Sequence, residues 1–310
     1  MAVRRRQNRF WKHERYYMET KTVKALRHER KIIECSVRDH FTFRMPVSVV
    51  FFYPQFVDPI VLTRALEHVL GDFPLFAGVL VKKDGQLYID CNNQGVSVTS
   101  ASVKLPFAHS LTRLPNLPAN TFVDLLNPFT ALRQQQPVLT IKISHCPDGT
   151  AIGYCWNHVI GDLSSFMELQ KALSAHILGK TYEKPIIPEN REPYFLRWEK
   201  ELPPTQGPSK LKRMKMGDMF SLLKAIYSPK RNVFIQFTQD EVTAMKATLS
   251  EQAGCKLSRN DAVCAHLLHL LAQCRTDQSE THYATIPIDF RRHAGIPQNT
   301  LGNCVDAVML

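Results

Sequence analysis

Apolar and polar positions predict an alternation of strands and helices between residues 36 and 185. Residues 47–53 are rich in β-branched and aromatic side chains, as strands are. Residues 60–70 follow Pro59 and place Leu62 and Leu66 on one helical face. Hairpin turns are predicted where strand-like runs flank Lys-Asp-Gly at 83–85 and Pro-Asp-Gly at 147–149. The predicted elements are strands 47–53, 79–81, 86–91, 138–145 and 151–157, with helices 60–70 and 166–178.

The pattern then breaks and resumes. Seven prolines between positions 185 and 229 predict a connection, residues 186–230, between two domains. Beyond it, strands are expected at 232–237 and 285–288 and helices at 239–251 and 260–274. Residues 1–35 are polar and basic without a clear period, so we expect an N-terminal extension. Residues 305–310 remain apolar where a domain ordinarily ends in polar, frayed residues. We therefore expect the second domain to be interrupted.

Composition narrows the class of protein. A hydrophobic content of 44% excludes a disordered chain, and no apolar run approaches the roughly 20 residues that cross a bilayer. The net charge of +11 is concentrated, because residues 1–33 hold 11 Lys/Arg against three Glu and residues 210–231 hold seven against one Asp. A solvated tail and a solvated linker account for this charge, so we expect neither a nucleic-acid nor a membrane partner.

Eight cysteines are spread from position 35 to position 304. None forms Cys-x-x-Cys, and none has a histidine at zinc-finger spacing. We expect reduced, buried thiols in a cytoplasmic protein and no metal site.

The stretch around His158 and Asp162 is the candidate for chemistry. With 12 His and, counted along the chain, 14 Asp, about half a His-x-x-x-Asp match is expected by chance, and two occur: His158 with Asp162, and His68 with Asp72. His158 ends a predicted strand, and Asp162 stands where it can cap the next helix. His68 lies off the apolar face of its helix, which favours a solvent-exposed histidine. For His158, a general base and a hydrogen-bonded core histidine are both open.

Six segments together have the order and spacing of a known family. They are His-Val-Ile-Gly-Asp at 158–162, Asp-Phe-Pro-Leu-Phe-Ala-Gly at 72–78, the run 87–95, the run 258–266, Asp-Phe-Arg at 289–291 and Leu-Gly-Asn at 301–303. The chain thereby resembles the BAHD family of acyl-CoA-dependent acyltransferases from about residue 36 onward. There are departures: Leu163 replaces the usual Gly, His293 replaces a basic residue, and the family's Asp-Phe-Gly-Trp-Gly motif is absent.

The resemblance implies an α+β, two-lobed, chloramphenicol acetyltransferase-like fold. Its N-terminal lobe would span 36–185, a Pro-rich basic crossover linker 186–230, and an incomplete second lobe 231–310. The implied reaction moves an acyl group from an acyl-CoA co-substrate to a hydroxyl or amine of a small acceptor, in a monomer. The alternatives are a non-catalytic binding or regulatory relative and a partial gene product that lacks the C-terminal segment.

The resemblance also assigns roles to residues. His158 would be the general base. Asp162 would form a salt bridge with Arg291 that fixes the loop, and Asn303 would belong to a structural Gly-Asn segment. Coenzyme A would meet the helix start at Ser258 and Arg259, and the basic Lys212 and Arg213 could attract its phosphates. For the last two, a solvated charge run is the competing interpretation.

Overall fold

The computed structural model describes residues 18–106, 117–132, 136–199, 235–274 and 285–309. The chain forms two compact units: residues 1–209 with 289–305, and residues 210–288 with 306–310. The structure therefore differs from the predicted lobe boundaries. Residues 289–305, expected in the second lobe, fold with the first unit because Leu301 enters its core and Arg291 pairs with Asp162.

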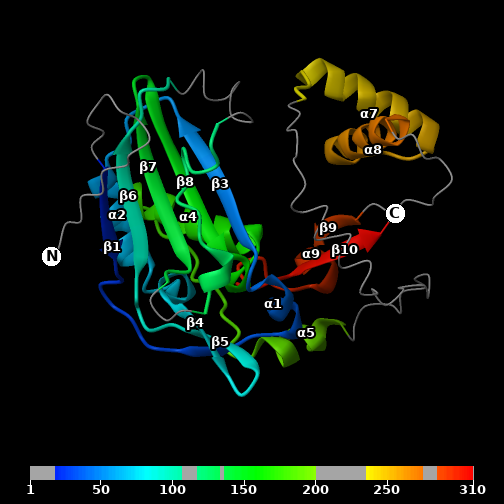
Figure 1. Ribbon diagram of the computed structural model, residues 1–310. Helices are drawn as coiled ribbons and strands as arrows, with labels where there is room; N and C mark the ends of the chain where they lie inside the picture. The colour runs from blue at the N-terminus through cyan, green and yellow to red at the C-terminus, as the bar shows by residue number, and fades with distance from the viewer. Residues whose placement is uncertain (1–17, 107–116, 133–135, 200–234, 275–284, 310) are drawn as a thin grey trace. The chain divides into compact units, whose positions relative to one another are not determined.

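A five-stranded sheet in the order β1-β6-β7-β8-β3 is the centre of the first unit (Figure 1). Strands β6 and β7 pair in parallel, and the remaining neighbours are antiparallel. The predicted strands and the hairpin that leads to His158 are confirmed. The strands are β1 (Met18–Val23), β3 (Pro46–Tyr53), β6 (Val96–Ser102), β7 (Leu139–Cys146) and β8 (Gly149–Asn157).

Helices α2 (Pro59–Val69) and α4 (Leu163–Ile177) cover one face of this sheet (Figure 1). Both helices have the predicted apolar faces, and their buried side chains share one core cluster with the sheet. Trp156 of β8 stacks on Phe166 of α4 with ring centroids 4.4 Å apart. Because β8 is held to α4 next to its end, the residues that follow Asn157 have a rigid base.

Residues 18–34, predicted to lie in an extension, form two strands. β1 pairs with β6 along its whole length, from Met18 opposite Ala101 to Val23 opposite Val96. β2 (Ile32–Glu34) joins β5 (Gln86–Asp90) and β4 (Val79–Lys83) in a three-stranded sheet. Charged residues interrupt the apolar pattern of β1, as is common in edge strands that avoid pairing with other chains. This is why the pattern did not predict it.

Short helical elements connect the strands, and α1, α5 and α9 among them contact the residues that follow β8. The short elements are α1 (Val37–Thr42), η1 (Pro74–Ala77), η3 (Pro128–Thr130), η4 (His158–Ile160), α5 (Arg191–Glu199) and α9 (Arg291–Ala294). Helix α5 lies in the stretch predicted to be a linker, so the first unit extends beyond residue 185. Two further strands, β9 (Thr285–Asp289) and β10 (Val305–Met309), pair with each other.

The second unit contains the predicted helices α7 (Gln239–Ala253) and α8 (Arg259–Gln273). Thr238 and Ser258 begin them as N-caps, each in a capping box with an acidic residue three positions later. The strand predicted at 232–237 is wrong where it can be seen, because residues 235–237 are irregular; residues 232–234 lie outside the described part. No helix in the described ranges has both the length and the apolar character needed to span a membrane.

Candidate active site

The backbone at His158 is fixed from both sides. His158 follows β8 directly and opens the single turn η4. Its backbone N–H donates to the carbonyl of Met45 at 3.0 Å. The side chain of Asn157 accepts from the N–H of Val159 at 3.1 Å and donates to the carbonyl of Phe43 at 2.7 Å. His158 is half-buried. Because β8 ends at Asn157, the predicted position of His158 at a strand end is confirmed.

The imidazole has one partner within the described part of the chain. Its Nδ1 lies 2.9 Å from Oδ1 of Asn303. The Nδ2 of Asn303 donates in turn to Oδ1 of Asp39, 2.7 Å away. No hydrogen bond from Nε2 to another described residue is present. The residue expected in a structural Gly-Asn segment therefore contacts the candidate base itself.

The hydrogen bonds of the Asp162 carboxylate go to residues other than His158. Its carboxylate accepts from the backbone N–H groups of Ser165 and Cys304, each at 2.9 Å. Two further bonds come from Arg291, at 2.8 and 3.0 Å. The predicted ion pair is therefore present and bidentate. Asp162 also caps α4, as expected.

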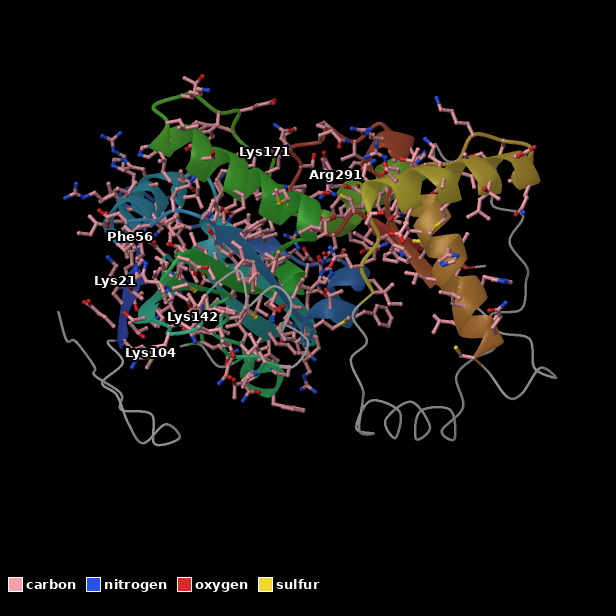
Figure 2. All side chains as sticks on the ribbon, turned by 90° about the horizontal axis from the view of Figure 1, so that it is seen from above. Lys21, Phe56, Lys104, Lys142, Lys171 and Arg291 are labelled. Atoms are coloured by element: carbon pink, nitrogen blue, oxygen red, sulfur yellow. The ribbon has the colours of Figure 1, made fainter. Side chains whose placement is uncertain are left out.

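Arg291, labelled in Figure 2, is fully buried and binds several groups of the same loop. Its guanidinium also donates to the carbonyls of Thr300 and Gly302, both at 3.1 Å, and contacts Asp289 at 3.0 Å. Burial disfavours its charge, but the hydrogen bonds and negative charge of Asp162 dominate and raise the pKa of Arg291. Arg291 thus ties residues 289–304 to the start of α4.

Two glycines permit this close packing. A Cβ on Gly161 would lie 2.5 Å from Cβ of Ser165. Gly302 has φ 145°, and a Cβ there would lie 2.9 Å from Cζ of Phe195. A larger residue at position 161 would push against α4, and one at position 302 would push against Phe195 of α5.

Arg191 is a site residue that the sequence pattern did not reveal. Its side chain is fully buried and donates to the carbonyls of Val159 at 2.5 Å and Ile160 at 3.1 Å. It also pairs with the buried Asp39 at 3.2 Å. The Ser-x-x-Asp capping box at the start of α1 is the one sequence signal that could have drawn attention to Asp39. Arg191 has no such signal, because it falls in the Pro-rich stretch.

Two of the four residues predicted to bind coenzyme A lie in the described part of the chain. Ser258 and Arg259 are exposed at the start of α8. Asp261 already occupies that helix start with its carboxylate, which weakens the attraction for another anion. Lys212 and Arg213 lie outside the described residues. Coenzyme A binding by these four residues stays a prediction.

The two substituted positions are accommodated. Leu163 is the first residue of α4 and is 56% exposed, so the side chain at this position meets no steric barrier. His293 lies within α9. Within the described ranges, no three His, Cys, Asp or Glu side chains come together in a way that could hold a metal ion.

Solved structures share this fold. Vinorine synthase superposes with a TM-score of 0.63 at 18% identity, covering 95% of this chain and 70% of that one. TRI101 of F. graminearum, solved with ethyl coenzyme A, also gives 0.63, at 13% identity over 91% of this chain and 69% of its own. The predicted α+β acyltransferase fold is confirmed.

The family follows from the sequence. The Transferase family model matches residues 17–310, and the chain belongs to this family, the BAHD acyltransferases. Putrescine hydroxycinnamoyltransferase 3 of Oryza sativa subsp. japonica is 23% identical over 284 residues, which are 88% of this chain and 63% of that relative. The chain thus spans less than two thirds of that relative's length.

Proposed function

We propose that the protein transfers an acyl group from an acyl-CoA thioester to a hydroxyl or amine of a small molecule. One observation carries the proposal: Asp162 is committed to Arg291 and the loop, while His158 keeps Nε2 free of described partners. A histidine so placed can act as a base without an ionised partner. The family relationship and the coenzyme A held by TRI101 support the choice of donor.

The reaction needs one proton carrier. As the acceptor's oxygen or nitrogen attacks the thioester carbonyl carbon, Nε2 of His158 takes its proton. The tetrahedral intermediate then collapses, the carbon–sulfur bond breaks, and the departing thiolate takes the proton from Nε2. Because a thioester is already activated, positioning of the two substrates with one base supplies much of the rate.

Product formation is the appropriate assay. Cys255 and Cys274 are exposed, so a reagent that detects free thiol would also react with the protein. Acetyl-CoA and a hydroxycinnamoyl-CoA should be offered with putrescine and with simple alcohols, and acylated products followed by mass spectrometry. Product that disappears in His158→Ala supports the proposal.

Two results would favour other interpretations. Saturable binding of coenzyme A without any product indicates the non-catalytic relative. Product formation that survives in His158→Ala would rule out His158 as the base. We further propose a cytoplasmic monomer; eight unpaired cysteines support a reducing compartment, and sedimentation velocity would test the monomer.

A further inference from the structure

We infer that Asn303 is a positioning residue that fixes the imidazole proton of His158 on Nδ1, and that Asp39 and Arg191 hold Asn303 in the required orientation. The consequence for catalysis rests on the proposed function, but the position of the proton does not. The inference depends on the chemistry of four buried or half-buried side chains in the first unit.

The orientation of the Asn303 amide follows from its neighbours. Its Nδ2 faces two oxygens, Oδ1 of Asp39 at 2.7 Å and Oγ1 of Thr42 at 3.3 Å. The Thr42 hydroxyl donates to the carbonyl of Asp39, which leaves its oxygen able to accept. If the amide were flipped, its oxygen would face a carboxylate, and two acceptors would confront each other. The Oδ1 of Asn303 therefore points to His158.

This orientation selects one tautomer of the ring. An amide oxygen only accepts hydrogen bonds, so the Nδ1 that lies 2.9 Å from it must carry the proton. In a neutral imidazole with Nδ1–H, the lone pair is on Nε2. The nitrogen that faces no described partner is thus the basic one.

Asp39 cannot turn to meet the amide differently. Its Oδ2 accepts from the backbone N–H of Ser36 at 2.8 Å and from the Ser36 hydroxyl at 3.0 Å. Its Oδ1 is paired with Arg191 at 3.2 Å, and both side chains are 0% exposed. Burial opposes the charge of Arg191, but the negative charge of Asp39, its hydrogen bond and the influence of Cys35 and Cys304 together raise the pKa of Arg191.

Arg191 couples the orientation of the amide to the position of the base. The same guanidinium that holds Asp39 binds the carbonyls of Val159 and Ile160, which follow His158 in η4. One buried side chain thus supports both the turn that carries the ring and the residue that orients its partner. The contacts run from Arg191 through Asp39 and Asn303 to Nδ1 of His158, which a purely stabilising role would not require.

The experiment is ¹⁵N NMR of the full chain labelled at histidine, with the His158 signals assigned by their loss in His158→Ala. Protonated and unprotonated ring nitrogens have widely different ¹⁵N shifts, so the tautomer is read directly above the pH at which the ring is charged. We expect the proton on Nδ1 in the wild type. In Asn303→Ala, we expect it to shift toward Nε2.

Two variants separate positioning from folding. Asn303→Asp retains an oxygen for Nδ1 but sets its second oxygen against the Asp39 carboxylate, so a loss of stability is expected, while the Nδ1–H form should persist in the folded variant. Asn299→Ala removes another buried amide of the same segment, one that donates to the carbonyl of Lys184, and should leave the tautomer unchanged. Thermal unfolding of each variant shows whether it is folded.

The inference is overturned if the wild-type proton lies on Nε2, or if folded Asn303→Ala keeps the wild-type tautomer. Neither result depends on turnover, so failure here is distinct from failure of the proposed function. Where product is formed, Asn303→Ala should lower kcat by about ten- to hundredfold with little change in KM.

Discussion

The two His-x-x-x-Asp pentapeptides of this chain have the same spacing and very different surroundings. His68 is exposed near the end of α2 and stacks on His176 with ring centroids 4.8 Å apart. Asp72 accepts from the Tyr182 hydroxyl at 2.9 Å and pairs with Lys184 at 2.8 Å, at a position partly open to solvent. His158 and Asp162 instead meet Asn303 and Arg291.

The difference shows that the motif's chemistry comes from the elements on either side of it. In the first copy the five residues leave a helix and enter η1; in the second they leave a strand and begin a helix. Only the second arrangement puts an aspartate at a helix start, where four N–H groups need acceptors. Its histidine then lies at the rigid edge of a sheet, where a partner can hold the ring.

Replacement of the two histidines should give the largest contrast. His158→Ala removes the proposed base, so acyl transfer should fall by about 10²- to 10⁴-fold. His68→Ala removes an exposed ring and should leave the rate within about twofold of the wild type, since surface substitutions rarely propagate. The rates are compared by product formation under identical substrate concentrations. Equal losses in the two variants would contradict the division between the copies.

Replacement of the two aspartates should separate their free energies of unfolding. Asp162→Ala leaves a buried guanidinium without its main partner, which typically costs about 3–5 kcal/mol. Asp72→Ala loses a partly exposed ion pair and one hydrogen bond, worth about 1 kcal/mol. Urea unfolding can be followed by intrinsic fluorescence, to which the core residue Trp156 contributes. Similar losses would show that the Asp162–Arg291 pair is not the stronger anchor.

The dependence of folding stability on pH should reveal a contribution from Asp289, which contacts Arg291 beside the His158 copy. Burial favours the protonated form of Asp289, but bonds from the Ser164 hydroxyl and from Arg291 together lower its pKa. The folded state therefore binds the proton more weakly than the unfolded state. The resulting stability is present above the ordinary Asp pKa of about 3.9 and is lost as pH falls through the lower folded value.

The free energy of unfolding in urea, measured between about pH 5 and pH 3, follows this effect across the ordinary Asp pKa. Asp289→Asn should reduce the slope of stability with pH, and Ser164→Ala should reduce it by a smaller amount. An unchanged slope in Asp289→Asn would show that its contacts with Arg291 do not contribute. The expected change is modest because Asp289 is 34% exposed.

Much of the fold was open to prediction because its strands and helices have strong local signals. The hairpin before His158 has a Pro-Asp-Gly turn, and α4 has regular apolar spacing. β1 was missed because its charged residues interrupt the apolar pattern, and residues 289–305 were assigned to the wrong unit because sequence order suggests the second lobe. Sequence order does not show which core a segment enters.

The site could be predicted only in part. His158, Asp162 and Arg291 came from the family resemblance, and the pair between the last two is confirmed. Asp39 and Arg191 lie 152 positions apart and have no shared pattern, so only their tertiary contact reveals them. The bond between Asn303 and His158 joins residues 145 positions apart and depends on the same packing.

Leu163 offers the smallest expected effect and a direct test of how local the motif is. It stands where the family usually has Gly, yet it begins α4 and is 56% exposed. Leu163→Gly adds backbone freedom to the unfolded chain and should lower the free energy of unfolding by at most about 1 kcal/mol. Since Asp162 keeps its bonds to Ser165, Cys304 and Arg291, product formation should not change. A marked change in the rate would mean that the residue after Asp162 helps to shape the site, and that the contrast with the His68 copy extends beyond the five residues.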